Sequence, residues 1–122
     1  MPDTWCIYYI PDCKQSIPIK DKFVVIVCQD YKPRGFFINS GLRPFINRYP
    51  YRVATQIPIK AISYRCLDHD SFIDCWELKE FDKKQLRNRI DALKDRTIEE
   101  IKKVVENSII IEERHINLIL GR

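Results

Sequence analysis

An uninterrupted apolar run in the first quarter of the chain restricts the possible folds more than any other feature. The run extends from Phe23 to Cys28 and is flanked by Lys22 and Gln29. Neighbouring side chains of a strand point to opposite faces, so a strand of this composition is buried on both faces and lies in the middle of a sheet. We therefore expect residues 22–29 to form a central strand.

The segments on either side of this run are rich in aromatic and β-branched residues and are broken by turn residues. This pattern is typical of short strands. We expect one strand at residues 5–10 and another at residues 35–40. Residues 29–35 contain Asp, Pro and Gly, so they predict a turn that joins the central strand to the next one as a hairpin.

Further along, residues 51–62 predict one or two strands. Pro58 interrupts them, and because proline has no amide hydrogen to donate to a neighbouring strand, it favours an edge of the sheet. Residues 72–81 alternate only in part, which predicts a mixed strand near the end of the sheet.

The hydrophobic period changes in the last quarter of the chain. An apolar stripe with helical spacing predicts a helix at residues 97–108, where Thr97 and Glu100 match a capping box. The stripe consists of Ile98, Ile101, Val104, Val105 and Ile109. Residues 113–120 predict a second, short helix followed by Gly121. The order of these elements indicates a mainly β fold with a C-terminal α part.

Length and composition fit a single domain that covers residues 1–122. The chain is 45% hydrophobic and 31% charged, as globular proteins are. The longest apolar run is too short to cross a bilayer. The N-terminus lacks the basic start and the long apolar stretch of a signal peptide. We expect a cytoplasmic protein that does not bind membranes.

The five cysteines argue against a disulfide framework and against a zinc site of the usual spacing. Their number is odd, and no two of them form a C-x-x-C pair. They are Cys6, Cys13, Cys28, Cys66 and Cys75. Cys28 and Cys75 lie in apolar segments, where a thiol behaves as a small hydrophobic group. We expect no metal and no cofactor.

Basic residues gather in the strand region, and the net charge of +4 suits a polyanionic partner. Between positions 32 and 65 the basic residues are Lys32, Arg34, Arg43, Arg48, Arg52, Lys60 and Arg65. The aromatic residues interleaved with them are Tyr31, Phe36, Phe45, Tyr49 and Tyr51. Cations mixed with flat aromatic rings are what single-stranded RNA prefers, although scattered basic residues on a sheet are usually solvated surface.

Three motifs occur in an order that matches a known family. The sequence S-F-I-D-C-W-E-L-K-E-F-D-K-K-Q-L covers residues 71–86, K-F-V-V-I-V begins at Lys22, and F-I-N-S begins at Phe37. The first resembles a segment of the MazF/PemK toxins in which a Ser and a hydrophobic strand are followed by D-Q-I-R-T-V-D-K-x-x-L. The second resembles the family's strand R-P-V-V-V-L, and the third resembles its motif P-I-T-S. The first match needs no gap, and the apolar positions of the predicted helix follow it as in the family.

This resemblance implies a small SH3-like barrel of twisted antiparallel strands with an amphipathic C-terminal helix. It also implies a homodimeric toxin of a toxin-antitoxin system, which an antitoxin protein neutralises. Members of the family commonly cleave single-stranded RNA without a metal, by attack of the 2′-hydroxyl on the adjacent phosphate. This reaction needs a base, a cation for the phosphorane and an acid for the leaving oxygen.

The resemblance assigns the catalytic positions and shows where this chain departs from the family. Lys22 stands where the family has its catalytic Arg, and Asn39, followed by Ser40, stands where it has its catalytic Thr. The PemK branch uses an Arg and an Asp at the positions of Asp74 and Trp76, so that pair is absent here. His69, between Asp68 and Asp70, can supply acid-base chemistry. The same three residues also suit an ordinary polar turn, and a metal site with Asp74 matches no usual ligand spacing.

Candidate RNA-binding residues come from two loops and the basic region. Lys14, Gln15 and Lys20 follow the first predicted strand, in the stretch that covers substrate in the family. Residues 41–52 are a candidate recognition loop. The complete set predicted to bind RNA is Lys14, Lys20, Arg34, Arg43, Arg48, Tyr49 and Arg52. Trp5 and Trp76 are assigned to core or dimer contacts.

Three functions remain open at this point. The first is a metal-independent endoribonuclease with Lys22, Asn39, Ser40 and His69 at its site. The second is a non-catalytic module of the same fold that binds a protein or RNA, which the replacements at positions 22 and 39 favour. The third is a gyrase-poisoning toxin of the same fold, which would act on protein and leave RNA intact.

Overall fold

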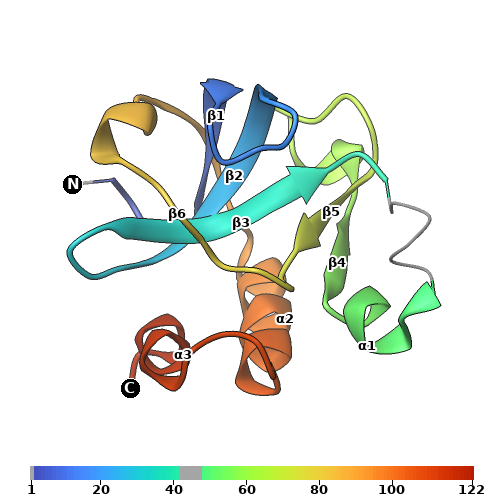
Figure 1. The fold of residues 1–122 in the computed structure, drawn as a ribbon. Coiled ribbons are helices and arrows are strands. Elements are labelled where there is room, and N and C mark those ends of the chain that lie inside the picture. The colour runs from blue at the N-terminus through green and yellow to red at the C-terminus, as the bar shows by residue number, and fades with distance from the viewer. Residues whose placement is uncertain (1, 42–47) are drawn as a thin grey trace.

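The computed structural model describes residues 2–41 and 48–122. Within these residues it shows a twisted, curled antiparallel sheet of seven strands followed by two helices that lie against one side of it (Figure 1). The strand order is β4-β5-β3-β2-β1-β7, and β6 also pairs with β3. The fold is the expected one, a small SH3-like barrel with a C-terminal α part. No helix in the described residues is long and apolar enough to span a bilayer.

The first three strands form a meander with the predicted apolar run at its centre. They are β1 (Cys6–Cys13), β2 (Lys20–Gln29) and β3 (Pro33–Asn39). Val24 of β2 lies opposite Tyr8 of β1 and Phe37 of β3. Val24, Val25 and Ile26 are fully buried. The prediction of a central strand buried on both faces is therefore confirmed.

The middle of the chain forms shorter elements than the sequence predicts. They are α1 (Pro50–Val53), β4 (Gln56–Ile59), η2 (Ala61–Ser63), β5 (Ser71–Asp74), β6 (Lys79–Glu80), η3 (Lys83–Gln85) and β7 (Asn88–Ala92). Residues 51–62 thus contain one strand between two helical turns, and it lies at the sheet edge as Pro58 predicts. The mixed strand at residues 72–81 is split in two, because the backbone N–H of Trp76 turns back to the carboxylate of Asp74 at 3.1 Å.

The C-terminal helices are α2 (Asp95–Glu106) and α3 (Glu113–Leu120). The bounds of α3 are as predicted, and Gly121 ends it in the left-handed conformation with φ 74°. Helix α2 begins before Thr97, so the predicted capping box there is wrong. The hydroxyl of Thr97 instead shares a hydrogen bond of 2.8 Å with that of Tyr64, and a capping box occurs at Asp82 and Gln85.

Two hydrophobic clusters pack on opposite faces of β2. Val25 and Val27 belong to the first, which also contains Ile101 and Val105 of α2. Val24 and Ile26 face the second, which fills the curl of the sheet with residues such as Phe81. Each cluster stabilises the fold because it removes apolar surface from water.

The cysteines Cys28 and Cys75 are buried in this core, and all five cysteines are free. Burial raises the pKa of the Cys28 thiol to about 11, so it is uncharged at neutral pH. Both side chains act as small hydrophobic groups, as the sequence indicates.

Gly35 provides a first test of this packing. It lies in β3 opposite Ile26, and a Cβ atom on it would lie only 2.0 Å from the carbonyl oxygen of Val25. We expect Gly35→Ala to lower the free energy of unfolding by about 1–3 kcal/mol or more, because the backbone must move apart. Urea unfolding measures the loss. Gly41→Ala is the matched control, since within the described part of the chain no atom beyond its own neighbours lies within 4 Å of its Cβ position. Equal stability of the two variants would contradict the β2–β3 register.

Tyr64 provides a second test, at the start of α2. Its buried hydroxyl accepts the backbone N–H of Lys94 at 3.0 Å and bonds the hydroxyl of Thr97. We expect Tyr64→Phe to cost about 1–3 kcal/mol, because it leaves two partners without a hydrogen bond. Thermal unfolding checks this. The exposed Tyr51 gives the control Tyr51→Phe, which should change stability little. If Tyr64→Phe leaves the melting temperature unchanged, these two hydrogen bonds do not stabilise the fold.

Candidate functional site

Two polar side chains meet where β2 begins and β3 ends. Phe23 and Ile38 are opposite each other in the β2–β3 ladder, so the next residues outward are Lys22 and Asn39. The ammonium of Lys22 donates to Oδ1 of Asn39 at 2.5 Å and lies 4.9 Å from the centre of the Phe37 ring. Only 7% of Lys22 is exposed. Its charge is therefore held in one place rather than on a mobile side chain.

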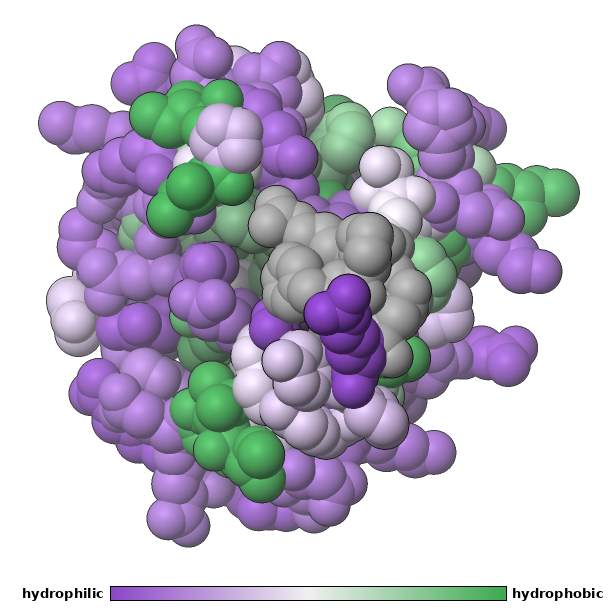
Figure 2. Space-filling model, turned by 45° about the vertical axis from the view of Figure 1, so that its right-hand side comes forward, coloured by the Kyte–Doolittle hydropathy of each residue, from purple (hydrophilic) through white to green (hydrophobic). Residues whose placement is uncertain are grey.

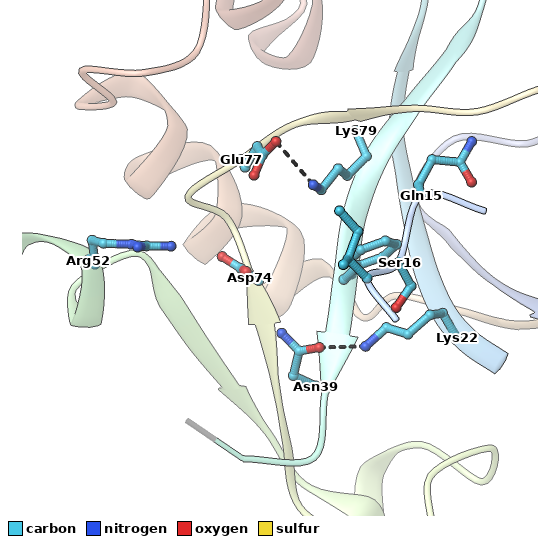
Figure 3. Close-up of a pocket in the computed structure, with 10 residues that line it drawn as sticks. Gln15, Ser16, Lys22, Asn39, Arg52, Asp74, Glu77 and Lys79 are labelled. Atoms are coloured by element: carbon cyan, nitrogen blue, oxygen red, sulfur yellow. Dashed lines mark hydrogen bonds and ion pairs between the residues drawn. The ribbon is translucent and has the colours of Figure 1, made fainter. Parts of the chain in front are cut away.

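This pair borders a cavity of about 260 Å³. Figure 3 shows Arg52 and Asp74 reaching it from one side and Lys22 and Ser16 from the other. Lys79 completes the set of basic residues and forms an ion pair of 3.0 Å with Glu77. Among the described lining residues, three cations face two carboxylates, so the cavity favours an anionic ligand.

Asp74 is held firmly at the edge of this cavity. It is the last residue of β5, and its Oδ1 accepts the side-chain amide of Gln56 at 2.8 Å as well as the Trp76 backbone N–H. Gln56 lies opposite Asp74 in the β4–β5 ladder. The strand pairing therefore positions a carboxylate next to the Lys22–Asn39 pair.

A second cavity of about 230 Å³ is also lined by Lys22. Its lining includes Lys20, Ser40 and His69. The four predicted catalytic residues are thus divided between two hollows, and Lys22 borders both. His69 lies in an exposed turn, where its backbone carbonyl accepts the hydroxyl of Ser71 at 2.9 Å.

The predicted RNA-binding residues are spread over several places. Arg52 lines the first cavity and Lys20 the second, and the ring of Tyr49 lies 5.8 Å from that of Tyr51, tilted by 52°. Arg48 is exposed. Arg43 lies outside the described residues.

Two of the predicted RNA-binding residues form ion pairs elsewhere. Lys14 pairs with Asp82. Arg34 is buried, where Nε lies 3.2 Å from the carboxylate of Asp30 and a terminal nitrogen lies 3.1 Å from that of Glu80. Its contacts give Arg34 a structural role, in which it joins the β2–β3 turn to β6.

The sequence did not indicate Glu77 or Lys79 as site residues. It assigned Trp76 to core or dimer contacts and gave Asp74 only as a weak alternative. All four lie near the end of β5 or beyond it, far along the chain from Lys22, and only the pairing of β3 with β5 and β6 brings them to the same place. Among the described residues, no group of three or more His, Cys, Asp or Glu side chains is arranged to hold a metal ion.

Comparison with known proteins supports the fold. No protein-family model and no curated protein matches the chain. Among solved structures, it is similar to the Mycobacterium tuberculosis toxin MazF-mt6, with a TM-score of 0.63, 88% of this chain and 98% of that chain covered, and 16% sequence identity. At this identity the similarity shows the fold alone. The MazF-like fold expected from the sequence motifs is thus confirmed.

The pair of Lys14 and Asp82 predicts how stability depends on pH. Hydrogen bonds from Lys14 and Lys32 lower the pKa of Asp82 to about 2, below the 3.8 of an ordinary carboxyl group. The folded state therefore binds this proton more weakly than the unfolded state. The stabilisation is complete above about pH 4 and is lost as the pH falls through about 2.

Melting temperatures measured between pH 2 and pH 5 test this linkage. We expect the protein with Asp82→Asn to lose stability less steeply with falling pH than the unaltered protein. Asp68→Asn, which removes an exposed carboxylate in a loop, is the matched control. Identical slopes for all three proteins would show that the ion pair does not couple to folding.

Proposed function

We propose that this chain is a MazF-type toxin that cleaves single-stranded RNA at the Lys22–Asn39 pair. The observation that carries the proposal is the buried Lys22 ammonium, fixed by Asn39 at the edge of a cavity with more cations than carboxylates. The fold is similar to that of a protein named as a toxin, MazF-mt6. The proposal includes a homodimer and an antitoxin partner, as the sequence resemblance implies, and a single domain in the cytoplasm, as length and composition indicate.

The reaction follows from the groups present at the site. The 2′-hydroxyl loses a proton, its oxygen bonds to phosphorus, and the bond from phosphorus to the 5′-oxygen breaks as that oxygen takes up a proton. The products are a 2′,3′-cyclic phosphate and a 5′-hydroxyl. Lys22 offsets the charge that grows on the phosphoryl oxygens. The side-chain oxygen of Asn39 accepts the hydrogen bond from Lys22. The amide nitrogen of Asn39 is therefore turned away from Lys22 and can donate to the same phosphate (Figure 3).

The acid and the base are assigned to residues of the two cavities that Lys22 borders. In-line displacement places the attacking and leaving oxygens on opposite sides of phosphorus, so the two groups come from different places. Asp74 lines the first cavity, and His69 and Ser40 line the second. We assign Asp74 as the base and His69 as the acid, with Ser40 as a hydrogen-bonding group for the phosphate.

A binding module without catalysis is the second candidate. A lysine offers a point charge, whereas the Arg that the resembled family has at this position binds phosphate through two parallel hydrogen bonds. Asn39 likewise replaces a hydroxyl with an amide. A module of this kind would bind RNA or an antitoxin-like protein at the same cavity and release it unchanged.

Incubation of the purified protein with a mixed RNA pool in the presence of EDTA tests the proposal. We expect cleavage that yields 5′-hydroxyl ends. Lys22→Met keeps the length of the side chain but removes its charge, so we expect the rate to fall at least about 100-fold, the usual effect of losing one group that stabilises the transition-state charge.

Lys84→Met is the matched control, because Lys84 is an exposed lysine away from both cavities. It should cleave RNA at the rate of the unaltered protein. RNA that is bound but never cut would favour the binding module. Intact RNA together with growth arrest on expression would favour a toxin that acts on protein.

A further inference from the structure

Three aromatic rings form a chain of ring contacts that is connected to the Lys22–Asn39 cavity through Arg52. Tyr49 and Tyr51 lie at the start of α1 with ring centres 5.8 Å apart, and Tyr51 lies 5.5 Å from Trp76, which follows β5. The guanidinium of Arg52 lies over the Trp76 ring at 5.2 Å. We call Tyr49, Tyr51 and Trp76 the aromatic row. It joins two segments that are far apart in the sequence.

The aromatic row is a surface feature rather than part of the core. Tyr49 is 42% exposed and Tyr51 is 54% exposed, whereas the packed aromatic residues Phe36 and Phe81 are fully buried. Rings that serve only to fill a core do not keep half of their surface in water. The row therefore leaves aromatic surface available to a ligand.

The aromatic row is fixed to the cavity by two connections. Arg52 connects the aromatic row with the cavity, because its guanidinium lies over the Trp76 ring and its side chain also lines the cavity. The carboxylate of Asp74, which lines the cavity, accepts the backbone N–H of Trp76. A ligand whose anionic part enters the cavity would therefore place its neighbouring part against these rings.

We propose that the aromatic row is a stacking subsite for an unpaired nucleobase of the RNA, next to the phosphate held at Lys22. This inference rests on the proposed function and adds the group that binds the base. Single-stranded RNA combines flat π faces with a phosphate at every step, and proteins bind it with aromatic rings and cations side by side. The proposal makes Trp76 a ligand contact, whereas the sequence assigned it to core or dimer contacts.

The surroundings favour RNA over a protein ligand. Among the described residues in the view of Figure 2, hydrophilic side chains predominate and hydrophobic ones gather in small, separate groups. A stable protein interface is built around a continuous apolar centre with a polar rim. A nucleobase needs only the area of one or two rings.

Tryptophan fluorescence reports directly on this subsite. The chain has two tryptophans, and Trp5 is engaged elsewhere, since its carbonyl accepts the N–H of Leu93 and Lys102 lies 5.7 Å from its ring. In the full chain with Trp5→Phe, Trp76 is the one remaining tryptophan. The probe is a mixed-sequence single-stranded RNA of nine nucleotides with 2′-O-methyl groups, which block the attacking hydroxyl.

We expect saturable quenching of Trp76 emission by this probe, because a stacked base contacts the indole face. In the chain with Trp76→Phe, the emission of Trp5 should not change. Tyr51→Ala should weaken binding of the probe, measured by fluorescence anisotropy, by about 5- to 150-fold, which corresponds to one lost base stack. Tyr51→Phe keeps the ring and should bind as the unaltered protein does.

The outcomes separate the subsite from the proposed function. If the probe binds but Trp76 emission is unchanged and Tyr51→Ala binds normally, the subsite is overturned while RNA binding stands. If the probe does not bind and RNA is not cut, the proposed function itself fails, and the subsite with it. Quenching by an acidic peptide but not by the probe would identify a protein-binding surface and would also overturn the subsite.

Discussion

The burial of β2 on both faces is the constraint on which the rest of the structure depends. A strand with apolar side chains on both sides has to be covered twice, and the chain does so with two different structures. Helix α2 supplies Ile101 and Val105 on one face, and the curl of the sheet brings Phe81 to the other. A flat sheet with helices on one side would leave Val24 and Ile26 in water, so the curl is a consequence of the sequence of β2.

The same strand fixes the position of the candidate site. Close approach of β2 and β3 at Gly35 leaves no room for a side chain, so the two backbones pair in one register. That register brings Lys22 and Asn39 together several residues away, at the end where the apolar run stops. Polar residues at the end of a buried strand are held by the core behind them, which is how a rigid scaffold positions functional groups.

Strong local patterns predicted the fold, and weak or distant ones did not. The central run, the edge position of Pro58 and helix α3 with Gly121 follow from periodicity and backbone chemistry. Strand β7 was missed, because N-R-I-D-A is mostly exposed and is a strand only through pairing with β1. At the site, Lys22 and Asn39 came from a resemblance, whereas the contributions of Lys79 and Trp76 depend on strand pairing that spacing alone does not reveal.

The contrast between Arg34 and Lys22 shows why basic composition alone does not locate the site. Both side chains are buried, but the partners of Arg34 are the carboxylates of Asp30 and Glu80, which cancel its charge where it lies. Lys22 donates to the amide oxygen of Asn39 and borders two cavities, one of which is also lined by Arg52 and Lys79. Basic composition alone therefore does not distinguish a buried structural arginine from a lysine at the edge of a cavity.

The two departures from the resembled family have a common explanation in this structure. Lys22 stands at the position of an Arg and Asn39 at that of a Thr, and read one at a time each replacement removes a catalytic group. In the sheet they face each other and are joined by a hydrogen bond of 2.5 Å. The amide of Asn39 extends further from the backbone than a hydroxyl would, and it meets the ammonium while presenting a nitrogen donor on its other side. The pair therefore combines a fixed cation with a neighbouring donor, and these are two of the groups that the proposed reaction uses.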